Sequence, residues 1–319
     1  MLHTRFTDRV GCELPIQQAG MGGVASPDLA VAVSAAGGLG TVALHMMPAP
    51  KVAQTLDAMS ERTDAPLAFN VLVPFADRGA VEMASSRCRL VEFFYDDPDP
   101  ELVRIVHEGG ALAAWQIGSR AEAEAARDAE CDIVIAQGVE AGGHVRGRVG
   151  LLPLLAEVLD AIDVPVVAAG GIGSGRAAAA ALAAGADAVR VGTRFVATHE
   201  ADTHPDYADA LVRARAEDTV LTKAFSVMWP NAPHRVLQSC VDQAEALDSD
   251  AVGEVDIGGT TMPVPRLSVL APTRETTGSV GAMALYAGES VTDVTGMVPA
   301  RSIVLEIATG AEELLRRWV

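Results

Sequence analysis

A histidine in a glycine-rich loop is the side chain of this sequence best suited to move protons. His144 follows Gly142 and Gly143 at the end of the stretch 137–144, QGVEAGGH, which comes directly after a short apolar run. Imidazole gains and loses a proton near neutral pH, and Glu140 lies nearby in the sequence. A lone histidine is also common as a structural or solvated residue, so its position by itself leaves both interpretations open.

Glycines after two later apolar runs indicate an anion site. Gly170 and Gly171 open the stretch 170–175, GGIGSG, and Gly192 precedes Thr193 after the next run. Glycine lets backbone N–H groups approach a phosphate closely, and the helix that follows adds a favourable dipole. Tight turns in an alanine- and glycine-rich chain would give the same residues. The pattern is not the G-x-G-x-x-G dinucleotide fingerprint, and no Walker A sequence is present.

The secondary-structure elements that position these residues can be predicted from the sequence pattern of the first two-thirds of the chain. Short apolar runs alternate with alanine-rich segments, which is typical of βα units around a parallel sheet. Helices are expected to begin after Ser26, a good N-cap followed by Pro27, and after Ser119. The eight expected strands are Pro15–Gly20, Leu39–Ala43, Leu67–Val73, Leu90–Phe94, Ala111–Gln116, Asp132–Ala136, Pro165–Ala169 and Ala188–Val191.

Eight similar units in a row predict an α/β fold, a (β/α)₈ TIM barrel with a small added C-terminal subdomain. An open doubly wound sheet is the alternative, but it needs a topological switch. The barrel is expected over residues 1–194, an added segment over 195–295 and a closing helix over 296–319. Within the added segment, Val255–Met262 predicts a hairpin with a Gly-Gly turn. In such barrels the active site lies at the C-terminal ends of the strands, and the loops after strands seven and eight are the usual phosphate site.

Composition argues against several classes of partner and location for this protein. The formal net charge of −18 disfavours nucleic acid and anionic membranes as partners. No run of eighteen apolar residues predicts a membrane span, and the N-terminus lacks the apolar stretch of a secretory signal. A cytoplasmic protein with reduced thiols and no bound metal is expected from four scattered cysteines, Cys12, Cys88, Cys131 and Cys240.

The stretch 137–144 resembles the hallmark of the nitronate monooxygenase family, formerly called 2-nitropropane dioxygenases. Further blocks similar to those of the family occur in the same order along nearly the whole chain. They are 15–23 (PIQQAGMGG), 36–40 (AGGLG), 69–71 (FNV), 168–172 (AAGGI), 192–195 (GTRF), 222–226 (TKAFS) and 285–290 (LYAGES).

This resemblance implies an FMN-dependent enzyme that oxidises alkyl nitronates with O2 to a carbonyl compound and nitrite. His144 matches the family's catalytic histidine, either as an imidazolium that stabilises a substrate anion or as a neutral base. The implied flavin contacts are Gly20, Met21 and Gly22 along the isoalloxazine, Asn70 and Gln116 at the ring or ribityl chain, and Gly170, Gly171, Gly192 and Thr193 at the phosphate.

Two departures from the family pattern bear on the substrate. The segment 227–235 replaces a Gly-Arg-Pro-Ala-Arg stretch, and one extra residue, Val145, follows His144. Some of the residues Trp229, Asn231 and His234 are therefore expected near the substrate, although Trp229 could instead pack under the added segment. The alternatives are an NAD(P)H-dependent flavin reductase for a quinone or an enoyl thioester, and a flavin-binding protein without turnover. The oligomeric state is left open.

Overall fold

The computed structural model describes residues 2–45, 47–257 and 260–318. Eight parallel strands form one sheet in the order β1-β9-β8-β6-β5-β4-β3-β2. Their bounds are β1 Ile16–Gln18, β2 Gly40–Val42, β3 Leu67–Leu72, β4 Leu90–Phe94, β5 Leu112–Ile117, β6 Ile133–Gln137, β8 Val166–Ala169 and β9 Ala188–Val191. Every expected strand is present, with ends that differ by at most three residues.

The two outer strands of this sheet meet and close it. Gln17 of β1 forms a parallel bridge with Leu39, just before β2. The Gln18 amide donates to the Leu39 carbonyl at 2.9 Å, and the Leu39 amide donates to the Ile16 carbonyl at 2.8 Å. The predicted (β/α)₈ barrel is therefore confirmed, and the open doubly wound alternative is excluded.

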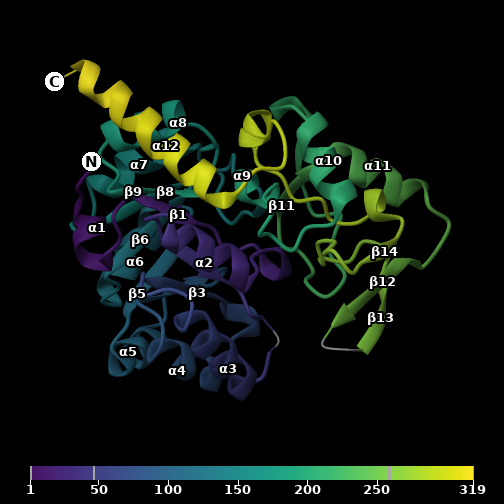
Figure 1. The fold of residues 1–319 in the computed structure, drawn as a ribbon, viewed down its shortest axis with the longest axis horizontal. Helices are drawn as coiled ribbons and strands as arrows, with labels where there is room; N and C mark the ends of the chain where they lie inside the picture. The colour runs from purple at the N-terminus through teal and green to yellow at the C-terminus, as the bar shows by residue number, and fades with distance from the viewer. Residues whose placement is uncertain (1, 46, 258–259, 319) are drawn as a thin grey trace.

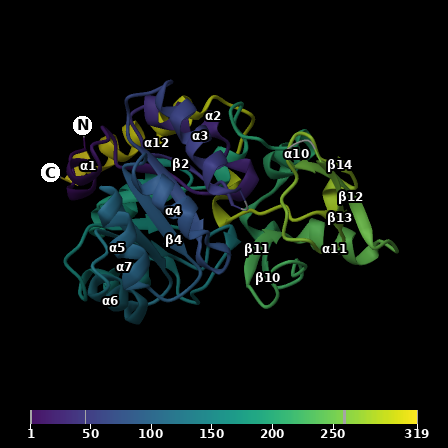
Figure 2. The ribbon, with the colours of Figure 1, turned by 90° about the horizontal axis from the view of Figure 1, so that it is seen from below.

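Helices follow the strands around the outside of the barrel (Figures 1 and 2). Both expected caps are present: the Ser26 hydroxyl accepts from the Leu29 amide at 3.1 Å, and the Ser119 hydroxyl accepts from the Glu122 amide at 3.3 Å. The helices are α2 Pro27–Ala35, α3 Ala49–Ser60, α4 Arg78–Ser85, α5 Pro100–Gly109, α6 Arg120–Asp128, α7 Leu151–Leu159, α8 Gly175–Ala183 and α9 Thr193–Val196, with short 3₁₀ turns η1 Gly22–Val24 and η2 Val73–Phe75.

The barrel interior is apolar in one half and polar in the other. Phe6 of helix α1 (Arg5–Val10) is fully buried in the apolar half, in one cluster with Leu90 of β4 and Ile133 of β6. Two residues along β4 the inward side chain is Glu92, which is also fully buried. Because side chains alternate along a strand, Leu90 and Glu92 both point into the barrel. Leu90 belongs to the apolar cluster with Phe6, and Glu92 lies nearer the end of the barrel where the strands finish.

The chain after α9 builds the added segment, which lies beside the barrel in Figure 1. Its elements are α10 Pro205–Arg213, η3 Ala216–Asp218, β10 Thr219–Thr222, β11 His234–Leu237, α11 Gln238–Ala246, β12 Ala251–Ile257, β13 Thr260–Pro265, β14 Thr277–Gly278, η4 Val280–Ala282 and η5 Glu289–Asp293. The expected hairpin is confirmed because Val255 pairs with Met262. Its Gly-Gly turn, Gly258 and Gly259, lies outside the described residues. The division of the chain at residues 195 and 296 stays a prediction.

The closing helix returns to the barrel. It runs over α12, Ala300–Leu315, and continues as the 3₁₀ turn η6, Arg316–Trp318, where a helix over Ser302–Val319 is expected. Val319 lies outside the described residues. Helix α12 lies along α8 (Figure 1), and a Cβ on Gly175 would lie only 2.7 Å from the Gly310 Cα. The two backbones therefore approach more closely than larger residues would allow.

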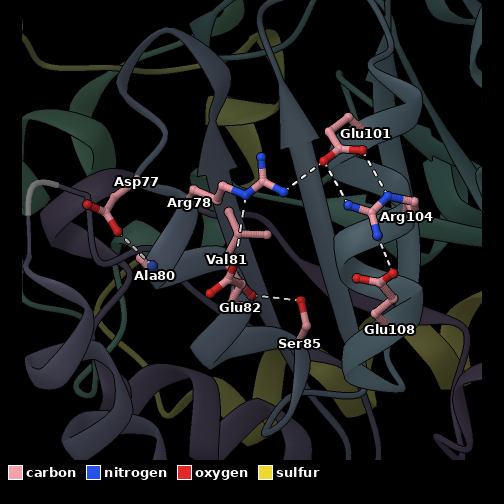
Figure 3. A network of polar contacts seen from close by, with 9 residues as sticks. All are labelled: Asp77, Arg78, Ala80, Val81, Glu82, Ser85, Glu101, Arg104 and Glu108. Atoms are coloured by element: carbon pink, nitrogen blue, oxygen red, sulfur yellow. Dashed lines mark hydrogen bonds and ion pairs between the residues drawn. The ribbon is translucent and has the colours of Figure 1, made fainter.

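Charged side chains on the outer helices pair with one another. Arg78 of α4 contacts Glu101 of α5 at 2.7 Å, and Arg104 contacts both Glu101 and Glu108 (Figure 3). Because these groups are solvated, the pairs contribute little to stability. In the part of the chain that the structure describes, no helix is long and apolar enough to cross a membrane.

Candidate functional site

A short strand from the added segment fixes the histidine loop. The residues Gly143–His144 form β7, which pairs antiparallel with β11, so that His144 lies opposite His234. The Val145 amide donates to the Pro233 carbonyl at 2.9 Å. From the end of β6, Gln137 Nε2 donates to the His144 carbonyl at 3.0 Å. His144 is therefore held at the C-terminal end of the barrel by contacts from both parts of the chain.

Aromatic rings enclose the His144 imidazole. Trp229 stacks on it with a centroid separation of 4.0 Å and an interplanar angle of 26°. Tyr95, which follows β4, and Tyr286 lie at centroid separations of 5.8 and 5.7 Å. Trp229 also meets Tyr95 edge-on at 4.6 Å. The divergent segment thus supplies a ring that covers the histidine.

This enclosure keeps His144 neutral. Burial, with a smaller contribution from the nearby His234, lowers the pKa of His144 to about 3. The Nε2 atom of His144 is buried and has no hydrogen-bond partner in the described part of the chain. His234 is fixed in its neutral form, because its Nε2 accepts from the Phe225 amide at 3.2 Å while Nδ1 lies 2.9 Å from the Ala232 carbonyl. The site therefore offers a neutral imidazole with a free basic nitrogen.

The tips of neighbouring strands bring several predicted flavin contacts together. A Cβ on Gly20 would lie 2.5 Å from the Asn70 Cβ, so the loop after β1 touches β3. A Cβ on Gly192 would lie 3.7 Å from the Met21 sulfur, so the same loop also borders the tip of β9. Gly22 has φ of +56°, which favours glycine.

The other predicted contacts differ in backbone conformation and in hydrogen bonding. Gly170 and Gly171 have φ of +107° and +67°, whereas Gly192 has φ of −115°. A Cβ on Gly192 would make only ordinary van der Waals contacts. The Thr193 hydroxyl accepts from the Gly288 amide at 3.0 Å and so already holds a loop of the added segment. Gln116 is buried on β5, and its side chain makes no hydrogen bond to any described residue.

A buried polar cluster beneath these loops was not expected from the sequence. Glu92 accepts from Gln17 Nε2 and from Asn70 Nδ2, each at 2.7 Å, and pairs with the Arg190 guanidinium. Both charged groups are almost fully buried. The sequence does contain an indication of this cluster. Glu92 and Arg190 are each the single charged residue of an otherwise apolar strand, in LVEFF and AVRV. Two such charges of opposite sign favour a pair across the barrel interior.

The residues present fit a flavin at the strand tips. Gln137 Oε1 and His144 Nε2 are buried without partners, and unpaired polar atoms of this kind call for a ligand or water. A Cβ on Gly192 would meet only ordinary contacts, with Ala19 at 3.5 Å and the Met21 sulfur at 3.7 Å, so the backbone of the last tip is lightly covered there. A Cβ on Gly170 or Gly171 would instead face the loop 138–141. Among residues 2–45, 47–257 and 260–318 no group of three or more acidic, histidine or cysteine side chains could hold a metal ion.

Sequence comparisons give relatives of two kinds. A family model described as nitronate monooxygenase matches residues 3–87 and 77–310. The (3aS,4S,5R,7aS)-5-hydroxy-7a-methyl-1-oxo-octahydro-1H-indene-4-carboxyl-CoA dehydrogenase of Rhodococcus jostii is 37% identical, over 75% of this chain and 66% of that enzyme. The protein of the same name from Mycobacterium tuberculosis is 36% identical, over 78% and 69%. A probable nitronate monooxygenase of Staphylococcus aureus is 29% identical, over 70% and 76%. The chain thus spans about two thirds of the length of the first two relatives.

Solved structures of similar proteins superpose on nearly the whole chain. FabK from Thermotoga maritima superposes with a TM-score of 0.85 at 30% identity, covering 100% of this chain and 99% of that one. A nitroalkane oxidase from Streptomyces ansochromogenes superposes with a TM-score of 0.82 at 31% identity, covering 99% and 100%. These coverages include the added segment as well as the barrel.

Proposed function

The chain belongs to the nitronate monooxygenase family, and from this premise we propose that it is an FMN-dependent nitronate monooxygenase. Its substrates would be alkyl nitronates and the nitroalkanes from which they form, and its products a carbonyl compound and nitrite. The observation that carries the proposal is the neutral, unpartnered Nε2 of His144 inside a ring of aromatic side chains. A carbon acid activated by a nitro group is the kind of substrate that such a base can deprotonate.

The cofactor would lie across the strand tips. Gly170, Gly171, Gly192 and the backbone of Thr193 would hold the phosphate, and Gly20 to Gly22 would border the ring. Asn70 and Gln116 would hydrogen-bond the ring or the ribityl chain, although the Asn70 amide nitrogen already donates to Glu92. When bound, FMN supplies the acceptor for the substrate's electrons and the route by which they reach O2.

The residues of the chain would act mainly through the proton. His144 Nε2 would take the proton from the carbon that bears the nitro group. The aromatic rings shield the imidazole and lower its pKa, so it is unprotonated at neutral pH and can accept a proton. The same shift weakens it as a base, because a general base works best with a pKa near the working pH. A neutral imidazole offers no fixed positive charge to a preformed nitronate, which needs no deprotonation.

A coenzyme A thioester is the second candidate substrate. The two relatives at 37% and 36% identity carry the name of a CoA dehydrogenase, and a thioester carbonyl also acidifies its neighbouring carbon. Arg148, which follows β7, and Lys223, which follows β10, are exposed, and neither forms an ion pair with a described residue. In a chain with a net charge of −18, free cations beside the site suit the phosphates of the coenzyme.

Anaerobic reduction of the bound flavin separates these candidates. We expect the released flavin to be FMN, because the chain has no dinucleotide fingerprint for an adenylate half. A nitroalkane or its nitronate should bleach the flavin, and air should then restore its colour with release of nitrite. Bleaching by an acyl-CoA but by no nitro compound would establish the second candidate. Bleaching by NADH alone would identify a reductase, and finding FAD or no flavin would contradict the proposal.

A further inference from the structure

A cavity beside the strand tips is lined in part by Asn70, a proposed flavin contact, but most of its wall has no role in the chemistry described so far. It has a volume of about 220 Å³ and lies between the ends of β2 and β3 and the start of α4. Most of its wall is apolar and is formed by Leu44, Met47, Phe69, Val71, Phe75 and Val81. The smallest ligand pockets measure roughly 300 Å³, so this cavity suits one part of a ligand rather than the whole.

The polar groups of the wall are few and largely engaged. His45 is hydrogen-bonded to the Asn70 side chain, and burial lowers the pKa of His45 to about 4, so this imidazole is neutral. The Asp77 carboxylate accepts from the Ala80 amide at 2.7 Å and caps α4 (Figure 3). A carboxylate in the wall of an acidic protein disfavours an anionic ligand. The wall therefore selects an uncharged group with at most one hydrogen-bonding function.

The cavity adjoins the candidate active site through packed aromatic rings. Phe75 lines it and meets Trp229 edge-on at 5.1 Å, and Trp229 in turn stacks on His144. Met47, Phe75, Val227 and Met228 are large apolar side chains that are nevertheless exposed, and they come from the two segments that meet here. Exposed apolar groups gathered at one place mark a binding surface for an apolar partner or ligand.

We propose that this cavity binds the uncharged hydrocarbon part of the substrate, an alkyl chain or ring, while the reacting carbon lies at His144. The inference rests on the proposed function because it extends the same site. It predicts that affinity rises with chain length. Each buried methylene should tighten binding about fourfold, until the cavity is full.

The test compares nitroethane, 1-nitrobutane and 1-nitrohexane. Their binding is measured by calorimetry without oxygen, on protein whose FMN has first been reduced with dithionite so that it cannot take electrons from the nitroalkane, and their turnover is measured separately. Ala76 is an exposed residue of the wall, so Ala76→Phe should fill the cavity without disturbing the core. It should flatten the chain-length series and leave nitroethane binding unchanged. Ala184→Phe is the matched control, because Ala184 is exposed and lies at the C-terminal end of α8. In this variant affinity should still rise with chain length.

The outcomes separate this inference from the proposed function. A chain-length series in binding that Ala76→Phe abolishes supports the cavity, even if no nitroalkane is turned over. Equal affinities for nitroethane and 1-nitrohexane overturn it, as does an identical series in the two variants. Loss of FMN affinity in Ala76→Phe would show that the cavity belongs to the cofactor and would also overturn it. If Ala76→Phe does not fold, Phe75→Ala, which opens the wall, must weaken 1-nitrohexane binding more than nitroethane binding.

Discussion

The charge state of one imidazole decides which chemistry this site can perform. The sequence allows His144 to act either as a cation beside a substrate anion or as a neutral base. Burial among aromatic rings lowers its pKa to about 3, because the protonated form would lose its hydration without gaining a carboxylate partner. The neutral base is therefore the form that the protein holds ready at physiological pH.

Removing the ring that covers His144 should reverse this effect. In Trp229→Ala, water reaches the imidazole, so the pKa of His144 should rise from about 3 towards its ordinary value of 6.5. An NMR pH titration of the imidazole signals measures it. Trp229→Phe keeps an aromatic cover and should hold the pKa low. The same low pKa in Trp229→Ala would mean that other groups bury His144.

Among the elements, the loops after β8 and β9 contain glycine for different reasons. Gly170 and Gly171 have φ values that favour glycine, so the fold alone accounts for them. Gly192 has φ of −115°, and a Cβ there would meet only ordinary contacts with Ala19 and Met21. These contacts do not exclude a side chain at position 192, so we propose that a ligand is the reason for this glycine.

We therefore expect Gly192→Ala to weaken FMN binding and leave the FMN-free protein as stable as before. A loss of about tenfold in affinity, measured by flavin fluorescence titration, corresponds to roughly 1.4 kcal/mol. Gly11→Ala is the matched control. Gly11 has φ of +86° and no neighbouring atom within 4 Å, so this variant should lose about 1–2 kcal/mol of stability and keep its FMN affinity. Unchanged FMN affinity in Gly192→Ala would remove position 192 from the phosphate site.

The strands and their order along the chain could be predicted, because apolar runs of four to eight residues alternate with capped helices over a long stretch. The pairing of His144 with His234 could not, because ninety residues separate them and both belong to very short strands. The ring enclosure depends on this pairing. Trp229 could be placed near the substrate only because its segment departs from the family pattern.

At the scale of the whole molecule, an ion pair inside the barrel connects two strands that lie four places apart in the eight-stranded sheet. Glu92 lies on β4 and Arg190 on β9, and Gln17 of β1 joins them through Glu92. The same carboxylate accepts from the amide of Asn70, a proposed flavin contact. A buried pair of this kind is weak evidence for stability, but the loss of one partner leaves an uncompensated charge.

Arg190→Met should therefore destabilise the protein strongly, by about 3–5 kcal/mol in the free energy of unfolding. Urea denaturation of the FMN-free protein measures it. Arg78→Met is the matched control, because the Arg78–Glu101 pair, drawn in Figure 3, is exposed and its loss should have little effect. Adding Glu92→Gln to Arg190→Met should recover part of the loss. Equal effects of Arg190→Met and Arg78→Met would show that the interior pair is well solvated.

The central claim is that His144 acts as a neutral base, and one measurement tests it most directly. Stopped-flow experiments without oxygen follow reduction of bound FMN by a freshly dissolved, neutral nitroalkane and by its preformed nitronate, in the wild type and in His144→Ala. The variant should keep its FMN, because the implied flavin contacts lie elsewhere. Its rate with the neutral nitroalkane should fall by about 10²–10⁴-fold, and its rate with the nitronate much less. A larger loss with the nitronate, or no loss with either, would contradict the account.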